Sequence, residues 1–241
     1  MNVNLLIEDT KDDIPPARPS ATLVLLRDGS DDLQVLLLRR GRQLSAFAGA
    51  WAFPGGVTEK TDRSPGGSNS SQMTARHTAV RELAEETGLT VDPDVLVPLS
   101  RWTTPVVMPH RFDTWFFLAA APRAQVRVDH SEIHDHRWIS PREALQNHRA
   151  GALPLFPPTW VTLFLLGDFH RSEAALAHAA GTPPYHYAPK VVTRGDETCF
   201  LYGGDQAYAR GPIDKPGPRH RLRVRGRDWQ YECTRDPRAR I

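Results

Sequence analysis

The stretch that decides the fold is residues 81–89, RELAEETGL, together with the tight turn FPGG at residues 53–56. On a helix each residue advances the chain by about 100°. That spacing gathers Glu82, Glu85 and Glu86 on one side of little more than one turn, nearly opposite an apolar face. The pattern therefore predicts an amphipathic helix with three carboxylates clustered on its polar side.

Such a cluster needs a neutralising partner. Carboxylates this close repel each other and raise one another's pKa. Arg81 lies four residues before Glu85 and offsets part of the charge. A hard divalent cation offsets more, because Mg²⁺ favours carboxylate oxygens and shares its coordination shell with substrate phosphates. The alternative is a solvated acidic helix face, but the glycine turn favours a metal, since the carbonyl of Gly56 can approach one closely.

Together these residues resemble the Nudix box, G-x5-E-x7-R-E-U-x-E-E-x-G-U, in which U is aliphatic. Gly56 takes the first place, and residues 81–89 fill the second half without a mismatch. Two departures stand out. Asp62 occupies the position of the first Glu, and eighteen residues separate it from Arg81, which amounts to an eleven-residue insertion. Asp62 is either a shortened acid of the box or a residue of a surface loop.

The resemblance implies a Mg²⁺-dependent hydrolase, with Mn²⁺ as a substitute, in which water attacks one phosphorus of a diphosphate linkage. It implies metal binding by Glu82, Glu85, Glu86 and the carbonyl of Gly56. It also implies that Arg81 orients Glu85. The partner is then a small nucleotide-derived diphosphate.

The box does not settle the general base or the substrate contacts. Glu85 and Glu132 are the candidate bases, and Glu132 could equally be a surface acid. Arg40, Gly55 and Gly56 are the predicted substrate-binding residues. Arg40 is either a forked donor to a phosphate or a solvated arginine at a strand end. The predicted catalytic residues are Glu85, Glu86, Arg81 and Glu132.

The segment upstream of the box points to one branch of the family. Residues 36–56 are similar to the lead-in of coenzyme A diphosphatases, and an inserted box is also a feature of that branch. The resemblance therefore favours coenzyme A or acyl-CoA as substrate. An ADP-ribose or NADH pyrophosphatase is the second reading. The third is a non-catalytic module that binds a nucleotide metabolite.

The order of patterned segments predicts the α/β (α+β) class, as a Nudix-type α/β/α sandwich with a mixed β-sheet and a C-terminal β-hairpin extension. We predict a flexible arm at 1–19, the Nudix domain at 20–180 and a packed extension at 181–241. Predicted strands cover 21–26, 33–39, 95–99, 113–119 and 136–139, predicted helices cover 73–87, 141–149, 159–169 and 172–180, and the hairpin strands lie at 222–224 and 229–231.

Composition excludes several function classes. The chain has 241 residues, 40% hydrophobic and 24% charged, with a net charge of +2. No long apolar run predicts a membrane span, and the N-terminus is a poor secretory signal. The two cysteines lack the spacing of a metal or disulfide framework. We therefore expect a cytoplasmic protein without membrane or nucleic-acid partners; a homodimer is an expectation from the resemblance alone.

The tail is more basic than the rest. Residues 210–241 hold ten basic and four acidic residues. In a strand Arg221, Arg223 and Arg225 share one face. These arginines either hold the 3′-phosphate of coenzyme A or form the solvated outer face of a hairpin.

Overall fold

The computed structural model describes residues 5–6, 14–41, 49–63, 71–128, 132–209 and 211–234. Its centre is an eight-stranded mixed sheet with the order β4-β3-β2-β7-β6-β9, to which β5 is added on β2 and β8 on β3. The strands are β2 (Arg18–Asp28), β3 (Leu33–Arg40), β4 (Trp51–Ala52), β5 (Gly55–Val57), β6 (Val97–Thr103), β7 (Phe112–Ala120), β8 (Ile133–Ile139) and β9 (Tyr185–Tyr187).

Strand β2 pairs with one strand, β7, along one edge and with two strands, β5 and β3, along the other. The pairing with β7 is parallel and covers residues 18–26. The divided edge pairs with β5 at residues 20–22 and with β3 at residues 26–28. Between these two stretches the Leu23 N–H donates to the Pro54 carbonyl at 2.9 Å. The FPGG turn therefore fills the gap where β3 separates from β2.

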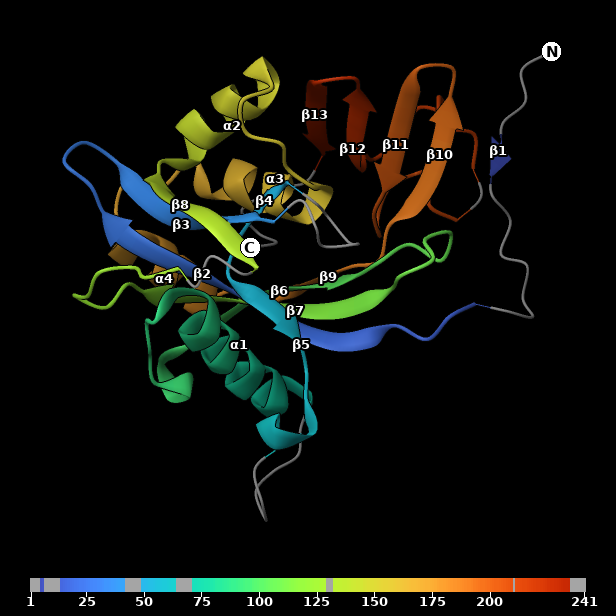
Figure 1. Ribbon diagram of the computed structural model, residues 1–241. Helices are drawn as coiled ribbons and strands as arrows, with labels where there is room; N and C mark the ends of the chain where they lie inside the picture. Colours follow the sequence, from blue (N-terminus) through green and yellow to red (C-terminus); the bar gives the residue numbers. More distant parts are fainter. Residues whose placement is uncertain are drawn as a thin grey trace.

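Helices cover both faces of this sheet (Figure 1). Helix α1 (Ser71–Thr87) packs on β2, β5 and β7. On the other face α4 (Ser172–Ala180) packs on β6 and β7, and α3 (Pro157–Leu166) packs with α2 (Pro141–Ala150). Two 3₁₀ helices, η1 (Lys60–Asp62) and η2 (Pro93–Val95), flank α1. The predicted α/β/α sandwich with a mixed sheet is confirmed.

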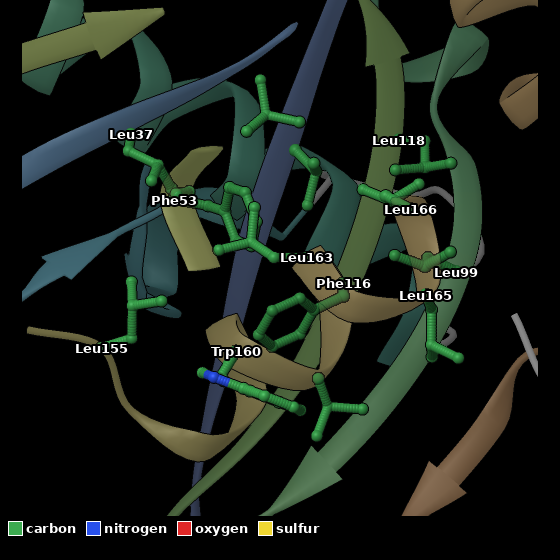
Figure 2. Close-up of a cluster of buried hydrophobic side chains, with 14 of the residues drawn as sticks. Leu37, Phe53, Leu99, Phe116, Leu118, Leu155, Trp160, Leu163, Leu165 and Leu166 are labelled. Carbon is green, nitrogen blue, oxygen red and sulfur yellow. The ribbon is translucent and has the colours of Figure 1, made fainter. Parts of the chain in front are cut away.

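The strand residues alternate between two cores, because successive side chains point to opposite faces. Leu23 and Leu25 join the core beneath α1. Val24 lies in the larger core, which Figure 2 shows around Leu163 and Trp160 of α3. Since both faces of the sheet are covered, the sequence of β2 is continuously apolar there and does not alternate between apolar and polar residues.

A second sheet follows the helices. It is five-stranded and antiparallel, in the order β1-β10-β11-β12-β13. The predicted C-terminal hairpin is confirmed as β12–β13, but it belongs to this larger sheet (Figure 1). The strands are β1 (Leu5–Leu6), β10 (Lys190–Arg194), β11 (Glu197–Leu201), β12 (His220–Arg225) and β13 (Asp228–Cys233).

Both ends of the predicted domain differ in detail from the structure. Of the predicted arm, Leu5–Leu6 pairs with β10, and β2 begins at Arg18; most of the rest lies outside the described residues. At the other end, β9 falls in the predicted extension yet pairs in parallel with β6 of the main sheet. The boundaries at 20 and 180 stay predictions, but the main sheet extends past both.

Helix α1 carries the acidic stretch and starts two residues earlier than predicted. It ends as expected: Gly88 has φ 68° and its N–H donates to the Ala84 carbonyl at 2.9 Å, which is the usual role of a glycine after a helix. The first residue of α1 is Ser71. No helix within the described ranges combines the length and apolar character that crossing a bilayer would take.

Candidate active site

The glycine turn and the acidic helix meet where β5 crosses α1. The Gly55 N–H donates to Glu86 Oε2 at 2.9 Å. A Cβ on Gly56 would lie 2.4 Å from the carboxyl carbon of Glu82, so any larger residue would displace that carboxylate from its present position. Gly55 has φ +154° and its Cβ would lie 2.3 Å from the Ala21 carbonyl. The structure thus brings both predicted glycines against the predicted acids.

Arg81 is the centre of the polar contacts. Its Nε lies 2.8 Å from Asp62 Oδ1, and its Nη1 lies 2.8 Å from Glu85 Oε2. Its Nη2 lies 2.9 Å from Glu82 Oε1 and donates to the Val57 carbonyl at 2.9 Å. The hydrogen bond to Asp62 is the largest cause that raises the pKa of Arg81. One guanidinium therefore holds three carboxylates, and the expected Arg81–Glu85 contact is present.

Asp62 reaches the site despite the insertion that separates it from α1. It is only 5% exposed and accepts hydrogen bonds from Arg81, from the Glu59 N–H at 2.8 Å and from the Thr78 hydroxyl at 2.9 Å. Burial acts to raise its pKa, but these donors hold the pKa below its ordinary value. The sequence left its role open; the structure makes it a partner of Arg81 rather than a plain loop residue.

The three helix carboxylates lie in different environments. The Glu85 side chain is 58% exposed, the Glu82 side chain 16%, and Glu86 is buried. Burial raises the pKa of Glu82, and it raises the pKa of Glu86 to about 8. The negative charges of Glu82 and Glu132 add to the rise at Glu86, whereas the Gly55 N–H and the positive charge of Arg40 oppose it.

Arg40 at the end of β3 and Glu132 just before β8 also act on this site. Both act electrostatically on Glu86, and Arg40 lies opposite Ile133 in the β3–β8 ladder. The Gly41 N–H donates to the Glu132 carbonyl at 2.8 Å. Within the described ranges, the buried Nε of Arg40 has no hydrogen-bond acceptor. Both predicted residues therefore lie close enough to Glu86 for their charges to act on its pKa.

The arrangement does not form a ready-made metal cluster. Across the described part of the chain, no three His, Cys, Asp or Glu side chains converge as metal ligands do. The reason is visible in the contacts: Glu82 and Glu85 each place an oxygen on Arg81, and Glu86 places one on the Gly55 N–H. The metal-binding role of these residues stays a prediction.

Sequence reasoning missed the polar residues beneath Arg81. The hydroxyl of Thr78 lies 3.0 Å from that of Thr58, and both sit beside Asp62. Helical spacing was the available signal, because Thr78 lies three residues before Arg81 and so shares its side of α1. Nothing in the sequence indicated that the carbonyl of Val57 would face the same arginine.

The three arginines of the basic tail have different surroundings in the structure. Arg221 is buried and binds Asp205 through two hydrogen bonds, of 2.7 and 2.6 Å. Arg223 binds Glu197 at 2.8 Å, and Arg225 also contacts Glu197 at 3.4 Å. The reading that assigns this face to the 3′-phosphate of coenzyme A stays a prediction, although each of the three guanidinium groups already contacts a carboxylate. The solvated-face reading fails for Arg221.

Comparison with known proteins agrees with this geometry. The family profile of the NUDIX domain matches residues 16–157, more than half of the sequence, and the chain therefore belongs to the Nudix family. The fold is also similar to the crystal structure of a NUDIX hydrolase from Alicyclobacillus acidocaldarius. That similarity has a TM-score of 0.61 and 26% identity, and it covers 68% of this chain and 97% of the other.

Curated relatives refine the family to a branch. Over 79 residues the chain is 42% identical to peroxisomal coenzyme A diphosphatase ndx-8 of Caenorhabditis elegans, covering 32% of this chain and 30% of that protein. Over 145 residues it is 28% identical to acyl-coenzyme A diphosphatase NUDT19 of Gallus gallus, covering 54% and 37%. The matched part spans well under two thirds of either relative. These names support the resemblance to the coenzyme A diphosphatase-type branch.

Proposed function

We propose that this protein is a Mg²⁺-dependent diphosphatase that hydrolyses coenzyme A or acyl-CoA. One observation carries the proposal: among the described residues, five carboxylates are linked by ion pairs or by electrostatic effects to only two guanidinium groups, so the acids of this set outnumber its cations. Crowded and partly buried negative charge of this kind is costly unless a cation binds. The carboxylates are Asp62, Glu82, Glu85, Glu86 and Glu132, and the guanidinium groups belong to Arg40 and Arg81.

The donor set suits Mg²⁺, or Mn²⁺ in its place. It consists of hard carboxylate and backbone oxygens, and the bare backbone of Gly56 lies directly against the Glu82 carboxylate. Mg²⁺ is commonly held by one or two carboxylates, with waters and substrate phosphates completing its shell, so three converging ligands are not required. Glu82, Glu85, Glu86 and the Gly56 carbonyl would hold the ion. When bound, it would polarise a phosphoryl oxygen and lower the pKa of a water.

The protein's own groups supply orientation and proton transfer. Arg81 fixes the Glu82 and Glu85 carboxylates, as the 2.9 and 2.8 Å contacts show. The buried Nε of Arg40 is suited to donate to a phosphate oxygen, which would give that N–H its acceptor. The proton of the attacking water would pass to Glu132 or to Glu85, the two predicted bases.

The substrate assignment rests on relatives rather than on a pocket. The names of ndx-8 and NUDT19 favour coenzyme A over the ADP-ribose and NADH alternatives. Location and assembly stay predictions as well. The sequence predicted a cytoplasmic protein, whereas the relative ndx-8 is named as peroxisomal, and the homodimer has no support beyond the family resemblance.

A substrate screen tests the proposal. The purified chain is incubated with coenzyme A, an acyl-CoA, ADP-ribose or NADH, with Mg²⁺ or with a chelator, and products are identified by mass. We expect 3′,5′-ADP and phosphopantetheine from coenzyme A with Mg²⁺ only. Faster turnover of ADP-ribose than of coenzyme A would instead favour the ADP-ribose pyrophosphatase alternative. Binding of a metabolite without any product under Mg²⁺ would favour the non-catalytic module instead.

A further inference from the structure

We propose that Thr78 is a positioning residue for the carboxylate site, an inference that rests on the proposed function. Thr78 is completely buried on α1 and precedes Arg81 by three residues. Its hydroxyl contacts Asp62, Thr58 and the Thr74 carbonyl, none of which is a proposed metal ligand. Its influence on the chemistry would therefore pass through Asp62 and Arg81.

The hydroxyl proton of Thr78 has one preferred acceptor. Its Oγ1 lies 2.9 Å from Asp62 Oδ2, 3.0 Å from Thr58 Oγ1 and 3.1 Å from the Thr74 carbonyl. A hydroxyl carries a single proton and two acceptor lone pairs. The carboxylate is charged and nearest, so it takes the proton. Thr58 can then donate to Thr78, which completes a chain of hydrogen bonds leading to Asp62.

Asp62 depends on this donor because it is sealed from water. Its Oδ1 faces Arg81 Nε at 2.8 Å. Its Oδ2 receives the Glu59 N–H at 2.8 Å, the Thr78 hydroxyl, and a longer contact of 3.2 Å from Arg81 Nη2. Without the hydroxyl, Oδ2 would keep the backbone donor and the long contact alone. The carboxylate would then be free to rotate toward other partners, and Arg81 would follow it.

A rotation of Arg81 would reach the proposed metal ligands directly. The guanidinium is planar and rigid, so its nitrogens move as one unit. The same group that binds Asp62 through Nε holds Glu85 through Nη1 and Glu82 through Nη2. Loosening Asp62 therefore disturbs the carboxylates of Glu82 and Glu85, which Thr78 itself is not seen to contact.

A set of threonine variants separates positioning from simple packing. Thr78→Val keeps the shape and removes the hydroxyl, whereas Thr78→Ser keeps the hydroxyl. Thr162→Val, at a buried threonine of α3 in the other core, is the matched control. We measure kcat, KM and the Mg²⁺ concentration for half-maximal rate with coenzyme A, together with thermal unfolding.

Positioning predicts a specific pattern. Thr78→Val should lower kcat and raise the Mg²⁺ requirement by about 10-fold or more, the usual scale for groups that support metal ligands, with little change in KM. Thr78→Ser should recover most of the rate, and Thr162→Val should match the wild type. A wild-type rate in Thr78→Val would overturn the proposal. So would equal losses in Thr78→Val and Thr162→Val, or a serine variant no better than valine.

The route through Asp62 has its own test. In an Asp62→Asn background the hydroxyl has no carboxylate to hold, so adding Thr78→Val should change kcat by less than about 2-fold. If the two substitutions instead lowered kcat independently, so that their fold-losses multiplied in the double variant, Thr78 would not act through Asp62.

Metal binding provides a readout that does not need turnover. Titration with Mn²⁺ alone should show weaker binding to Thr78→Val than to the wild type, with recovery in Thr78→Ser. If the wild type cleaves none of the diphosphates, the proposed function falls while this titration still tests Thr78. Equal Mn²⁺ affinity in all variants, or no Mn²⁺ binding by the wild type, would overturn the positioning role.

Discussion

Two arginines organise carboxylates in this molecule, and they do so in opposite ways. Arg221 in the C-terminal sheet forms an ion pair with a single carboxylate, that of Asp205, through contacts of 2.7 and 2.6 Å, and both side chains are at most 5% exposed. Arg81 beneath the glycine turn binds Asp62, Glu82 and Glu85 at once. In the first network one positive charge meets one negative charge away from solvent, and we call it closed. The second carries surplus negative charge and reaches solvent at Glu85, and we call it open.

The difference separates a structural ion pair from the site that we propose binds a cation. Asp205 also accepts the His220 and Ala207 N–H groups at 2.8 Å, so its oxygens are fully used. Burial opposes ionisation there, yet those donors hold the pKa of Asp205 below its ordinary value. At Glu86 burial prevails and raises the pKa to about 8. The fold has neutralised one region, whereas the other keeps crowded carboxylates, where we propose that a cation binds.

Breaking the closed pair should give the largest effect. Asp205→Ala leaves the Arg221 guanidinium buried without its partner, and such losses cost about 3–5 kcal/mol in the free energy of unfolding. Urea denaturation measures it. The turnover of the folded fraction should be unchanged. Replacing both residues, as Asp205→Ala with Arg221→Met, should recover part of the loss; a double variant as unstable as the single one would contradict this account.

Breaking the open network should act on turnover instead. Glu85→Gln removes a proposed metal ligand and candidate base, so we expect kcat with Mg²⁺ to fall about 100-fold, equal to about 2.7 kcal/mol in activation free energy. Its unfolding temperature should hold or rise, because one of several crowded negative charges is gone. Steady-state kinetics and thermal melts measure the two quantities. Retained activity would remove Glu85 from the site.

The sequence predicted those features of the site that depend only on residues close together in the chain. The acidic helix, its end at Gly88 and the position of the glycine turn follow from spacing within short windows. The alternation of β2 between two cores also follows once both faces are known to be covered. Local pattern was enough to identify the box and to place three carboxylates on one helix.

The rest depends on contacts between distant residues. Glu86 is buried against the Gly55 N–H, 31 residues away in the sequence, whereas helical spacing alone grouped it with Glu82 and Glu85 on one polar face. The role of Asp62 depends on how the η1 turn folds back on α1. The five-stranded sheet and the pairing of β9 with β6 join segments whose patterns are individually short. The spacing of apolar residues in the sequence does not determine which strand a short apolar segment will pair with.

The junction of α2 with the C-terminal sheet offers a smaller, pH-dependent test. His148 is buried, its ring lies 4.5 Å from that of Trp229, and Leu155 N–H donates to its Nδ1 at 3.2 Å. Burial lowers its pKa, and the charge of Arg227 adds to this effect. The unfolded chain therefore takes up the proton more readily, so folding stability should fall as pH drops below about 6.5.

Denaturation curves at pH 8, 7, 6 and 5 measure this dependence for the wild type and for His148→Gln. The difference between the two curves isolates the histidine from the other titrating groups. The variant should lose less stability between pH 7 and 5 than the wild type does. Parallel curves would show that the pKa of His148 is the same in the folded and unfolded protein, and the junction would then tolerate the charged ring.

The smallest effect should come from the exposed end of the arginine face. Arg225 contacts Asp196 at 3.5 Å and Glu197 at 3.4 Å, and its side chain is 61% exposed. Exposed pairs of this kind contribute less than about 1 kcal/mol, so Arg225→Ala should barely change the free energy of unfolding. Because its charge is used within the sheet, the ratio of rates on coenzyme A and on 3′-dephospho-coenzyme A should also stay the same. A variant that lost the preference for the 3′-phosphate would show that this arginine exchanges its carboxylates for the substrate, and the distinction between a closed and an open region would then no longer hold for the tail.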